Sequence, residues 1–274
     1  MKRPVAKILL AALWILTVGF VFGSPGRFPQ AQASGGTDAV GVPVIVELFT
    51  SEGCSSCPPA EALLAKFESQ QPISHAQVIA LEEHVDYWND LGWVDPFSGR
   101  EWTERQQDYA ASLGNRNPYT PQIVVNGHTE FVGSHERQAW RAIGEAAAAP
   151  KTNVSVTVAQ SDNRNSARFD VSVGKIMGGR PGDAPEIWLA ITESGLRSAV
   201  TSGENSGKEL NHASIVRVLR KIGVADENKD SSFTKNVSVG LDSGWKRQNL
   251  RAVVFVQDRK SRQIVGAAAA RLGQ

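Results

Sequence analysis

The sequence is poor in cysteine: only Cys54 and Cys57 occur among its 274 residues. A chain of this size can bury enough apolar surface to fold without a disulfide, so it does not need a structural staple. A bridge between positions three apart would also close a very short loop and remove little entropy from the unfolded chain. The cysteine pair is therefore better explained by a chemical role than by a structural disulfide.

Basic stripes and paired histidines are also missing. No run of lysine and arginine marks a surface for nucleic acid or an anionic membrane. The five histidines show none of the paired spacings that metal sites use; they are His75, His84, His128, His135 and His212. We therefore expect no resident metal ion and no bound cofactor.

Long apolar runs are absent except for one near the N-terminus. Residues 8–22 are apolar apart from Thr17 and Gly19, follow a basic start and precede a small-x-small motif that ends at Ala33. A core of about 15 residues is short for a membrane span, which favours a signal peptide over an uncleaved anchor. The pattern predicts a signal peptide over residues 1–33, with cleavage after Ala33.

The chain that remains after cleavage, residues 34–274, is mildly acidic. Removing the four basic residues of the leader from the 29 in the chain leaves 25 against 28 acidic residues, a formal net charge of −3. We expect a secreted or periplasmic protein with no membrane span after cleavage. Export also implies an oxidising compartment, where disulfides form and persist.

The two cysteines stand between a predicted strand and a predicted helix. Residues 42–49 form an apolar run with strand character, and residues 60–67 follow a helical pattern. A C-x-x-C motif in this position is typical of a dithiol redox site. The unpaired N–H groups and the dipole at a helix N-terminus favour thiolate, the species that attacks disulfides. We expect Cys54 to be the more exposed, attacking cysteine and Cys57 to resolve the mixed disulfide.

A proline opens a later strand of the chain. Thr120 and Pro121 precede the strand-like residues 122–125. Proline at a strand start removes no interior ladder bond, so an ordinary trans proline fits there. A cis Thr120–Pro121 bond would instead present the Thr120 backbone to an incoming peptide. By base rates alone a cis bond is expected in only about 5–6% of cases, and the neighbouring dithiol raises that expectation considerably. Thr120 and Pro121 are the candidate substrate-binding residues.

The two halves of the chain differ in texture. Up to Pro150, strand-like and helix-like segments alternate, whereas residues 153–158, 167–173, 186–192, 236–241 and 250–257 are strand candidates separated by polar turns. One helix is predicted in the second half, over residues 213–222. This pattern predicts an α/β domain at residues 34–150 and a β-rich, sandwich-like domain at residues 151–274.

The cysteine motif and the Thr120–Pro121 pair together resemble the thioredoxin superfamily. More specifically, residues 47–60, 84–88, 91–98 and 119–122 are similar to the secreted family known as domain of unknown function 1223. Downstream, residues 203–205 and 252–257 also match, so the likeness covers nearly all of the mature chain. The resemblance implies a thioredoxin-like domain with a β-rich extension, and it supplies no substrate.

Glu47 and His84 are candidates for proton transfer or thiolate stabilisation, the first from a comparison with thioredoxin and the second from its place in the predicted sheet. Thioredoxin has an aromatic residue before its first cysteine and a buried acid six positions before it, where this chain has Gly53 and Leu48. Glu47 is the nearest acid, a candidate proton acceptor for Cys57 unless it lies on the polar face of the sheet. His84 follows the second predicted strand and is a candidate thiolate partner or general base, unless it only packs or caps.

These features favour an exported thiol–disulfide oxidoreductase that acts on protein thiols or disulfides through Cys54 and Cys57. Two alternatives stay open at this point. The chain can be a non-catalytic binding module on a thioredoxin-like scaffold, with the cysteines locked as a structural disulfide. It can also be a copper(I) metallochaperone that binds the ion through both thiolates and His84. The sequence assigns neither a direction of electron flow nor an oligomeric state.

Overall fold

The computed structural model describes residues 41–273, except 116, 161, 162, 164, 180, 181 and 227–230. The described residues belong to one compact unit, Thr37–Gln274. The predicted signal peptide, residues 1–33, lies outside them. None of the helices within the described residues has the length and apolar character to cross a membrane.

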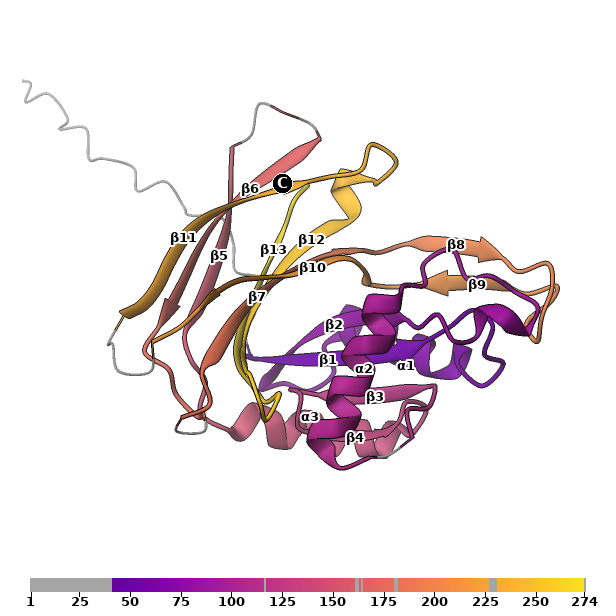
Figure 1. The fold of residues 1–274 in the computed structure, drawn as a ribbon, viewed down its shortest axis with the longest axis horizontal. Coiled ribbons are helices and arrows are strands. Elements are labelled where there is room, and N and C mark those ends of the chain that lie inside the picture. Colours follow the sequence, from indigo (N-terminus) through magenta and orange to yellow (C-terminus); the bar gives the residue numbers. More distant parts are fainter. Residues whose placement is uncertain are drawn as a thin grey trace, which may run out of the picture. The chain divides into compact units, whose positions relative to one another are not determined.

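A mixed eight-stranded sheet forms the centre of this unit, in the order β13-β12-β7-β10-β2-β1-β3-β4 (Figure 1). Its strands are β1 (Val42–Thr50), β2 (Ala76–His84), β3 (Gln122–Val125), β4 (Thr129–Val132), β7 (Pro185–Glu193), β10 (Ile215–Val224), β12 (Leu250–Asp258) and β13 (Ile264–Arg271). The β1–β2 and β2–β10 pairs are parallel and the other pairs are antiparallel. Strands from both sides of the predicted boundary near residue 150 therefore share one sheet.

Three helices cover the part of the sheet that contains β1, because its side chains alternate between two apolar faces. On one face Val44, Val46 and Leu48 pack against α1 (Pro58–Gln70) and α3 (Glu136–Ala148). Ile45 and Phe49, which alternate with these residues along β1, point to the other face and pack against side chains of α2 (Arg100–Leu113). Two short 3-10 helices, η1 (Asn89–Leu91) and η2 (Arg247–Asn249), lie in connections.

A second, three-stranded sheet covers the other part of the large sheet. It has the order β11-β6-β5 and consists of β5 (Val154–Ala159), β6 (Ser166–Gly174) and β11 (Ser231–Gly240). Alternate residues of β6, among them Phe169 and Val171, share one apolar core with Leu189 of β7 and Val254 of β12. A separate hairpin, β8 (Leu196–Ala199) with β9 (Glu209–His212), projects from the second half of the chain (Figure 1). The fold is thus mixed α/β, with two sheets packed face to face in its second half.

The predicted helix over residues 213–222 is wrong, because this segment is strand β10. Ile215, Val218, Leu219 and Ile222 have a spacing that fits one face of a helix. In the structure the segment pairs with β7 over most of its length and touches β2 at Ile215. Cross-strand pairing at the centre of a large sheet outweighs local periodicity here, and the β-branched residues favour the strand.

Candidate functional site

The two cysteines form a disulfide at the start of α1, with Cα atoms 5.4 Å apart. Cys57 directly precedes the helix, and its carbonyl oxygen accepts hydrogen bonds from the N–H groups of Ala60 and Glu61. Pro58 and Pro59 fill the first turn and carry no N–H. The helix dipole is therefore directed at the cysteine loop, although two of the usual N-terminal donors are missing.

The disulfide is covered, and the expectation that Cys54 is the more exposed cysteine is wrong. Both cysteines have an exposed fraction of 0%, while Ser55 and Ser56 between them are exposed. The Ser56 hydroxyl oxygen lies 3.4 Å from the Cys54 sulfur. The sulfurs therefore lie just beneath an exposed pair of serines.

The Thr120–Pro121 pair lies close to the cysteine loop, and its peptide bond is cis, the form whose expectation the dithiol context raised. A Cβ atom built on Gly133 would lie 2.9 Å from the Ala60 Cβ and 3.2 Å from the Pro121 Cβ, so Pro121 is near the first turn of α1. The indole N–H of Trp88 donates to the Thr120 hydroxyl at 2.9 Å. The structure thus brings Cys54, Cys57, Thr120 and Pro121 into one region.

Trp88 also covers the cysteine loop on the Gly53 side. A Cβ atom built on Gly53 would lie 3.3 Å from the Trp88 Cβ, a tight contact that leaves no room for the aromatic residue that thioredoxin has there. Trp88 belongs to a loop whose Tyr87, Leu91 and Val94 side chains have exposed fractions of 40%, 61% and 69%. An exposed apolar surface therefore borders the loop that contains the disulfide.

Glu47 is not brought to the cysteines. Its side chain lies on the sheet face covered by α2, where Arg105 Nε donates to Glu47 Oε1 at 2.6 Å and the Tyr109 hydroxyl donates to Oε2. The neighbouring residue Leu48 points instead to the face that packs on α1. Burial lowers the pKa of Arg105, but Glu47, Tyr109 and Glu83 together outweigh it and the net pKa is raised. The proposed transfer of a proton from Cys57 to Glu47 is thereby corrected.

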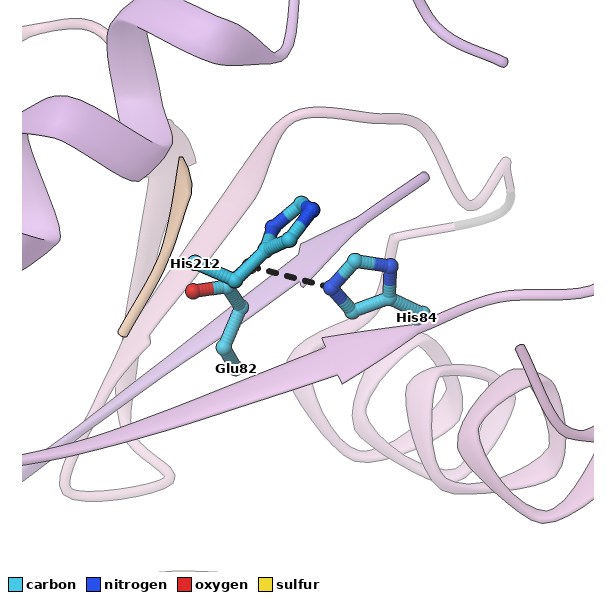
Figure 2. Close-up of side chains that lie close together, drawn as sticks. All are labelled: Glu82, His84 and His212. Atoms are coloured by element: carbon cyan, nitrogen blue, oxygen red, sulfur yellow. Dashed lines mark hydrogen bonds and ion pairs between the residues drawn. The ribbon is translucent and has the colours of Figure 1, made fainter. Parts of the chain in front are cut away.

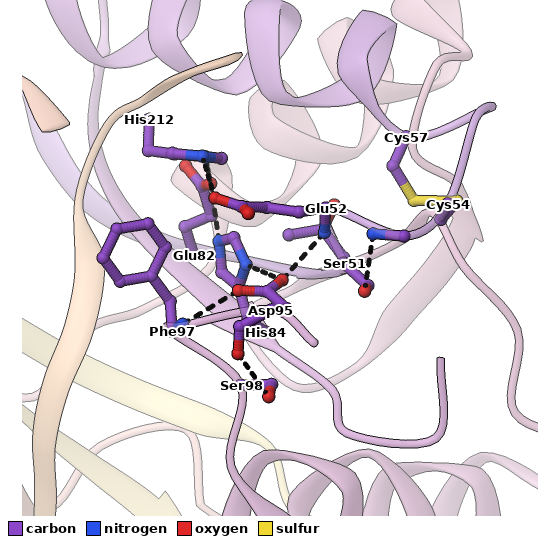
Figure 3. A network of polar contacts seen from close by, with 12 residues as sticks. Ser51, Glu52, Cys54, Cys57, Glu82, His84, Asp95, Phe97, Ser98 and His212 are labelled. Atoms are coloured by element: carbon purple, nitrogen blue, oxygen red, sulfur yellow. Dashed lines mark hydrogen bonds and ion pairs between the residues drawn. A yellow bond between two sulfur atoms is a disulfide. The ribbon is translucent and has the colours of Figure 1, made fainter. Parts of the chain in front are cut away.

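His84 is part of a buried chain of acids and histidines instead of a partner of Cys54 (Figure 3). Its Nδ1 lies 2.7 Å from Asp95 Oδ2 and its Nε2 lies 3.0 Å from Glu82 Oε1. The same Glu82 oxygen lies 2.9 Å from His212 Nδ1, and His212 Nε2 lies 3.1 Å from Glu52 Oε1. Both nitrogens of His84 face carboxylates and both sulfurs are joined in the disulfide, so this structure does not form the predicted copper site of His84 and two thiolates.

The charges in this chain stabilise one another. Burial alone lowers the pKa of each histidine, but the adjacent carboxylates outweigh it, raising the pKa of His84 well above its ordinary value and that of His212 to about 9. Burial likewise raises the pKa of Glu82 and Asp95, and the hydrogen bonds from the histidines reverse this effect in both. These shifts favour the cationic imidazoles and the ionised carboxylates of Glu82 and Asp95.

Glu61 is a buried acid that the sequence analysis missed. It lies four residues after Cys57, one turn into α1, with an exposed fraction of 3%. The Thr50 hydroxyl donates to its Oε1 at 2.6 Å. Burial and the charge of Glu82 raise the pKa of Glu61 to about 7, although His212 and His84 lower it in part. The i, i+4 spacing from Cys57 is the signal that would have identified it.

A loop from the second half of the chain closes over the cysteine loop. Asn205 Nδ2 donates to the Glu52 carbonyl at 2.8 Å and to the Cys54 carbonyl at 3.0 Å. The Glu204 carboxylate accepts the Ser55 N–H at 3.0 Å. No sequence pattern predicted these contacts, beyond the inclusion of residues 203–205 in the family resemblance.

Comparison with known proteins identifies one family and two well-aligned structures. The family model described as "Protein of unknown function (DUF1223)" matches residues 45–257. The crystal structure of an Agrobacterium tumefaciens protein aligns with a TM-score of 0.63 and 28% identity, covering 85% of this chain and 96% of that one. HBP35 of Porphyromonas gingivalis aligns with a TM-score of 0.65 and 16% identity, covering 86% and 77%, which shows a likeness of fold. No curated protein matches the sequence.

Proposed function

The chain belongs to the DUF1223 family, and we propose that it is an exported thiol–disulfide oxidoreductase acting on protein thiols or disulfides. The observation that carries this proposal is the Cys54–Cys57 disulfide at the first turn of α1, beside Thr120 and Pro121. We further propose a thioredoxin-like fold for residues 34–150. The strand order β2-β1-β3-β4, with α1 and α3 on one face and α2 on the other, supports it.

The chemistry needs only the two cysteines and a substrate. In the reduced protein the Cys54 thiolate attacks a substrate disulfide, and one substrate sulfur leaves as a thiolate. The Cys57 thiolate then attacks Cys54 of the mixed disulfide, releases the second substrate sulfur and restores the Cys54–Cys57 bond. The protein loses two electrons and the substrate gains two. The same steps in reverse oxidise a substrate dithiol.

Glu61 is the proposed proton acceptor for Cys57. It lies one helical turn beyond Cys57 on α1, is buried, and has a pKa of about 7, which suits proton exchange near neutral pH. The Cys57 thiol loses its proton to the Glu61 carboxylate before it attacks the mixed disulfide, and the proton returns when the pair is reduced.

The test is to trap the mixed disulfide. The Cys57→Ser variant, produced in the compartment to which the chain is exported, should retain substrate proteins on Cys54 in complexes that dissociate on reduction. The Cys54→Ser/Cys57→Ser variant is the matched control and should retain none. If the single variant captures nothing above this control, and Cys54 alkylates no faster than an ordinary cysteine, the proposal fails.

A binding module with a structural disulfide is the second candidate, and the burial of both sulfurs favours it. Its signature is a disulfide that resists mild thiol reductants in the folded protein. A redox-active bond would instead be reduced by them and reform in air. Measuring the fraction of free thiols in the native protein over a series of reductant concentrations separates the two.

A further inference from the structure

We propose that Glu82, His84 and His212 bind a divalent transition-metal ion, with Zn²⁺ as the best match. Glu82 and His84 are at the end of β2, whereas His212 ends β9 (Figure 2). One potential ligand atom from each of the three side chains lies within 4.8 Å of the other two, and all three residues are buried. Two imidazoles and a carboxylate are a ligand set that Zn²⁺ accepts.

The two histidines turn one nitrogen each toward a common point. His84 Nε2 and His212 Nδ1 lie 3.0 Å and 2.9 Å from the same atom, Glu82 Oε1. Tetrahedral ligands held about 2.0–2.1 Å from Zn²⁺ are separated by about 3.3 Å. The two distances to Glu82 Oε1 are within a few tenths of an ångström of that value, and the two nitrogens lie within 4.8 Å of each other. An ion held between this oxygen and the two nitrogens would replace the two protons that the imidazoles share with Glu82.

The outer nitrogens supply an independent observation. His84 Nδ1 is held by Asp95 and His212 Nε2 by Glu52, at 2.7 Å and 3.1 Å. A metal-binding histidine almost always donates its other N–H to a carboxylate, carbonyl or water, which fixes the tautomer and the ring orientation. Here both histidines have such a partner, and both partners are carboxylates.

These outer carboxylates are themselves fixed in place. Asp95 accepts the backbone N–H groups of Glu52 and Phe97, each at 2.8 Å. The indole N–H of Trp93 donates to Glu52 Oε2 at 2.8 Å. Figure 3 shows the contacts of Asp95 with Glu52, Phe97 and His84. A site whose supporting groups are oriented to this degree is prepared to hold an ion without rearrangement.

The surroundings also suit a closed site. The ring of Phe97 packs edge-on against His84 and His212, with centroid distances of 5.6 Å and 5.4 Å. The second Glu82 oxygen accepts the Ala213 N–H, which orients the carboxylate. Because these groups are covered by protein, the ion would enter during folding and remain bound.

The experiment measures Zn²⁺ uptake by the mature full chain with its disulfide formed. The protein is unfolded with a chelator, refolded with or without Zn²⁺, and passed through a desalting column before the metal is counted and the unfolding midpoint is measured. We expect about one Zn²⁺ per chain and a higher midpoint for the metal-loaded protein. A refolded protein that retains no Zn²⁺, with an unchanged unfolding midpoint, would overturn the proposal. The acids and histidines would then form a hydrogen-bonded network only.

Variants locate the ion. His212→Gln should lose at least 100-fold in Zn²⁺ affinity, whereas His128→Gln, a change at an exposed histidine, should bind as the wild type does. Asp95→Asn keeps all three ligands and should bind 10- to 100-fold more weakly, as expected for an outer-shell partner. If His212→Gln fails to fold, Asp95→Asn and the wild-type stoichiometry still decide the question.

The proposal is independent of thiol chemistry. The Cys54→Ser/Cys57→Ser variant should bind Zn²⁺ as tightly as the wild type, and Co²⁺ in its place should give a visible spectrum without a thiolate charge-transfer band. Loss of the metal in this variant would show that the thiols hold the ion and would overturn the assignment to Glu82, His84 and His212. Because the measurement needs no redox activity, it stands whether or not the oxidoreductase proposal holds.

Discussion

The side-chain amide of Asn205 donates a hydrogen bond to the backbone carbonyl of Cys54, 151 residues earlier in the chain, at 3.0 Å. The same nitrogen donates to the Glu52 carbonyl at 2.8 Å, and Asn205 is fully buried. A residue from the second half of the chain therefore fixes the conformation of the cysteine loop. A movement of the cysteine loop away from Asn205 has to break these two bonds.

Replacing Asn205 tests this relationship. Asn205→Ala removes a donor from two buried carbonyl oxygens, of which that of Cys54 keeps the Cys57 N–H, so we expect the free energy of unfolding to fall by about 1–3 kcal/mol. The native disulfide should also be reduced several-fold faster by a small thiol, because the loop opens more often. Denaturant titration measures the change in stability, and counting free thiols at successive times after the reductant is added measures the rate of reduction.

The matched control is Ser202→Ala, which removes one exposed hydrogen bond from the same loop to the Gly92 carbonyl. It should change neither stability nor the rate of reduction appreciably. Equal reduction rates for Asn205→Ala and the wild type would contradict the role given to Asn205.

The cluster around Glu47 yields a second prediction, because its geometry assigns it to stability and not to thiol chemistry. Arg105 and Tyr109 both bind the Glu47 carboxylate, and Arg105 also donates to Gln257 at 3.2 Å. Arg105→Met leaves Glu47 as a buried, uncompensated charge, so the free energy of unfolding should fall by about 3–5 kcal/mol. At temperatures where the variant is folded, it should exchange thiols at the wild-type rate. A loss of exchange activity in the folded variant would return Glu47 to the reaction.

Local sequence predicted much of the cysteine region. The strand before the motif and the helix after it follow from residues that determine their own backbone conformation, whereas the expectation of a cis bond before Pro121 depended on the dithiol. Spacing along the chain said nothing of the buried acid–histidine network. His212 meets Glu82 because β10 pairs with β2 at Ile215, a pairing that depends on the whole sheet. Because residues 213–222 were predicted to form a helix, the pairing of β10 with β2 was not expected.

Exposure was also beyond the sequence. The position of Cys54 before a helix predicted an accessible sulfur, but residues 88 and 205, from two other segments, cover its loop. Glu47 shows the complementary case: strand alternation correctly raised the possibility that it faces away from α1. Periodicity determines which face a side chain occupies, whereas coverage depends on segments distant in sequence.

A third prediction concerns how stability depends on pH through Glu61. Its pKa is raised from 4.5 to about 7 in the folded protein, so between these values the folded state binds more protons than the unfolded state. The stabilising effect is complete below about pH 4.5 and is lost as the pH rises through about 7. Glu61→Gln removes this titration. Between these pH values the free energy of unfolding of the wild type should fall by up to roughly 3 kcal/mol more than that of the variant.

The comparison is made by urea unfolding at a series of pH values. Glu145→Gln, a change near the end of α3, is a suitable control and should follow the wild-type curve. Parallel curves for Glu61→Gln and the wild type would mean that the Glu61 carboxyl titrates normally. In the thiol-exchange assay Glu61→Gln should also slow resolution by Cys57 at neutral pH, with a smaller effect at high pH, where the thiol ionises by itself.

The exposed apolar side chains beside the cysteine loop lead to the last prediction. Leu91 and Val94 lie on the loop that contains Trp88, and both are largely exposed. If substrates are unfolded or extended protein segments, these side chains offer apolar contact next to Thr120. Leu91→Ser/Val94→Ser should therefore slow exchange with a denatured, disulfide-containing protein several-fold and leave exchange with a small disulfide unchanged. Met177→Ser is the control, because Met177 is also exposed but belongs to the second half of the chain. It should change the rate of exchange with neither substrate. Equal slowing with both substrates would show that the double change disturbs the cysteine loop itself.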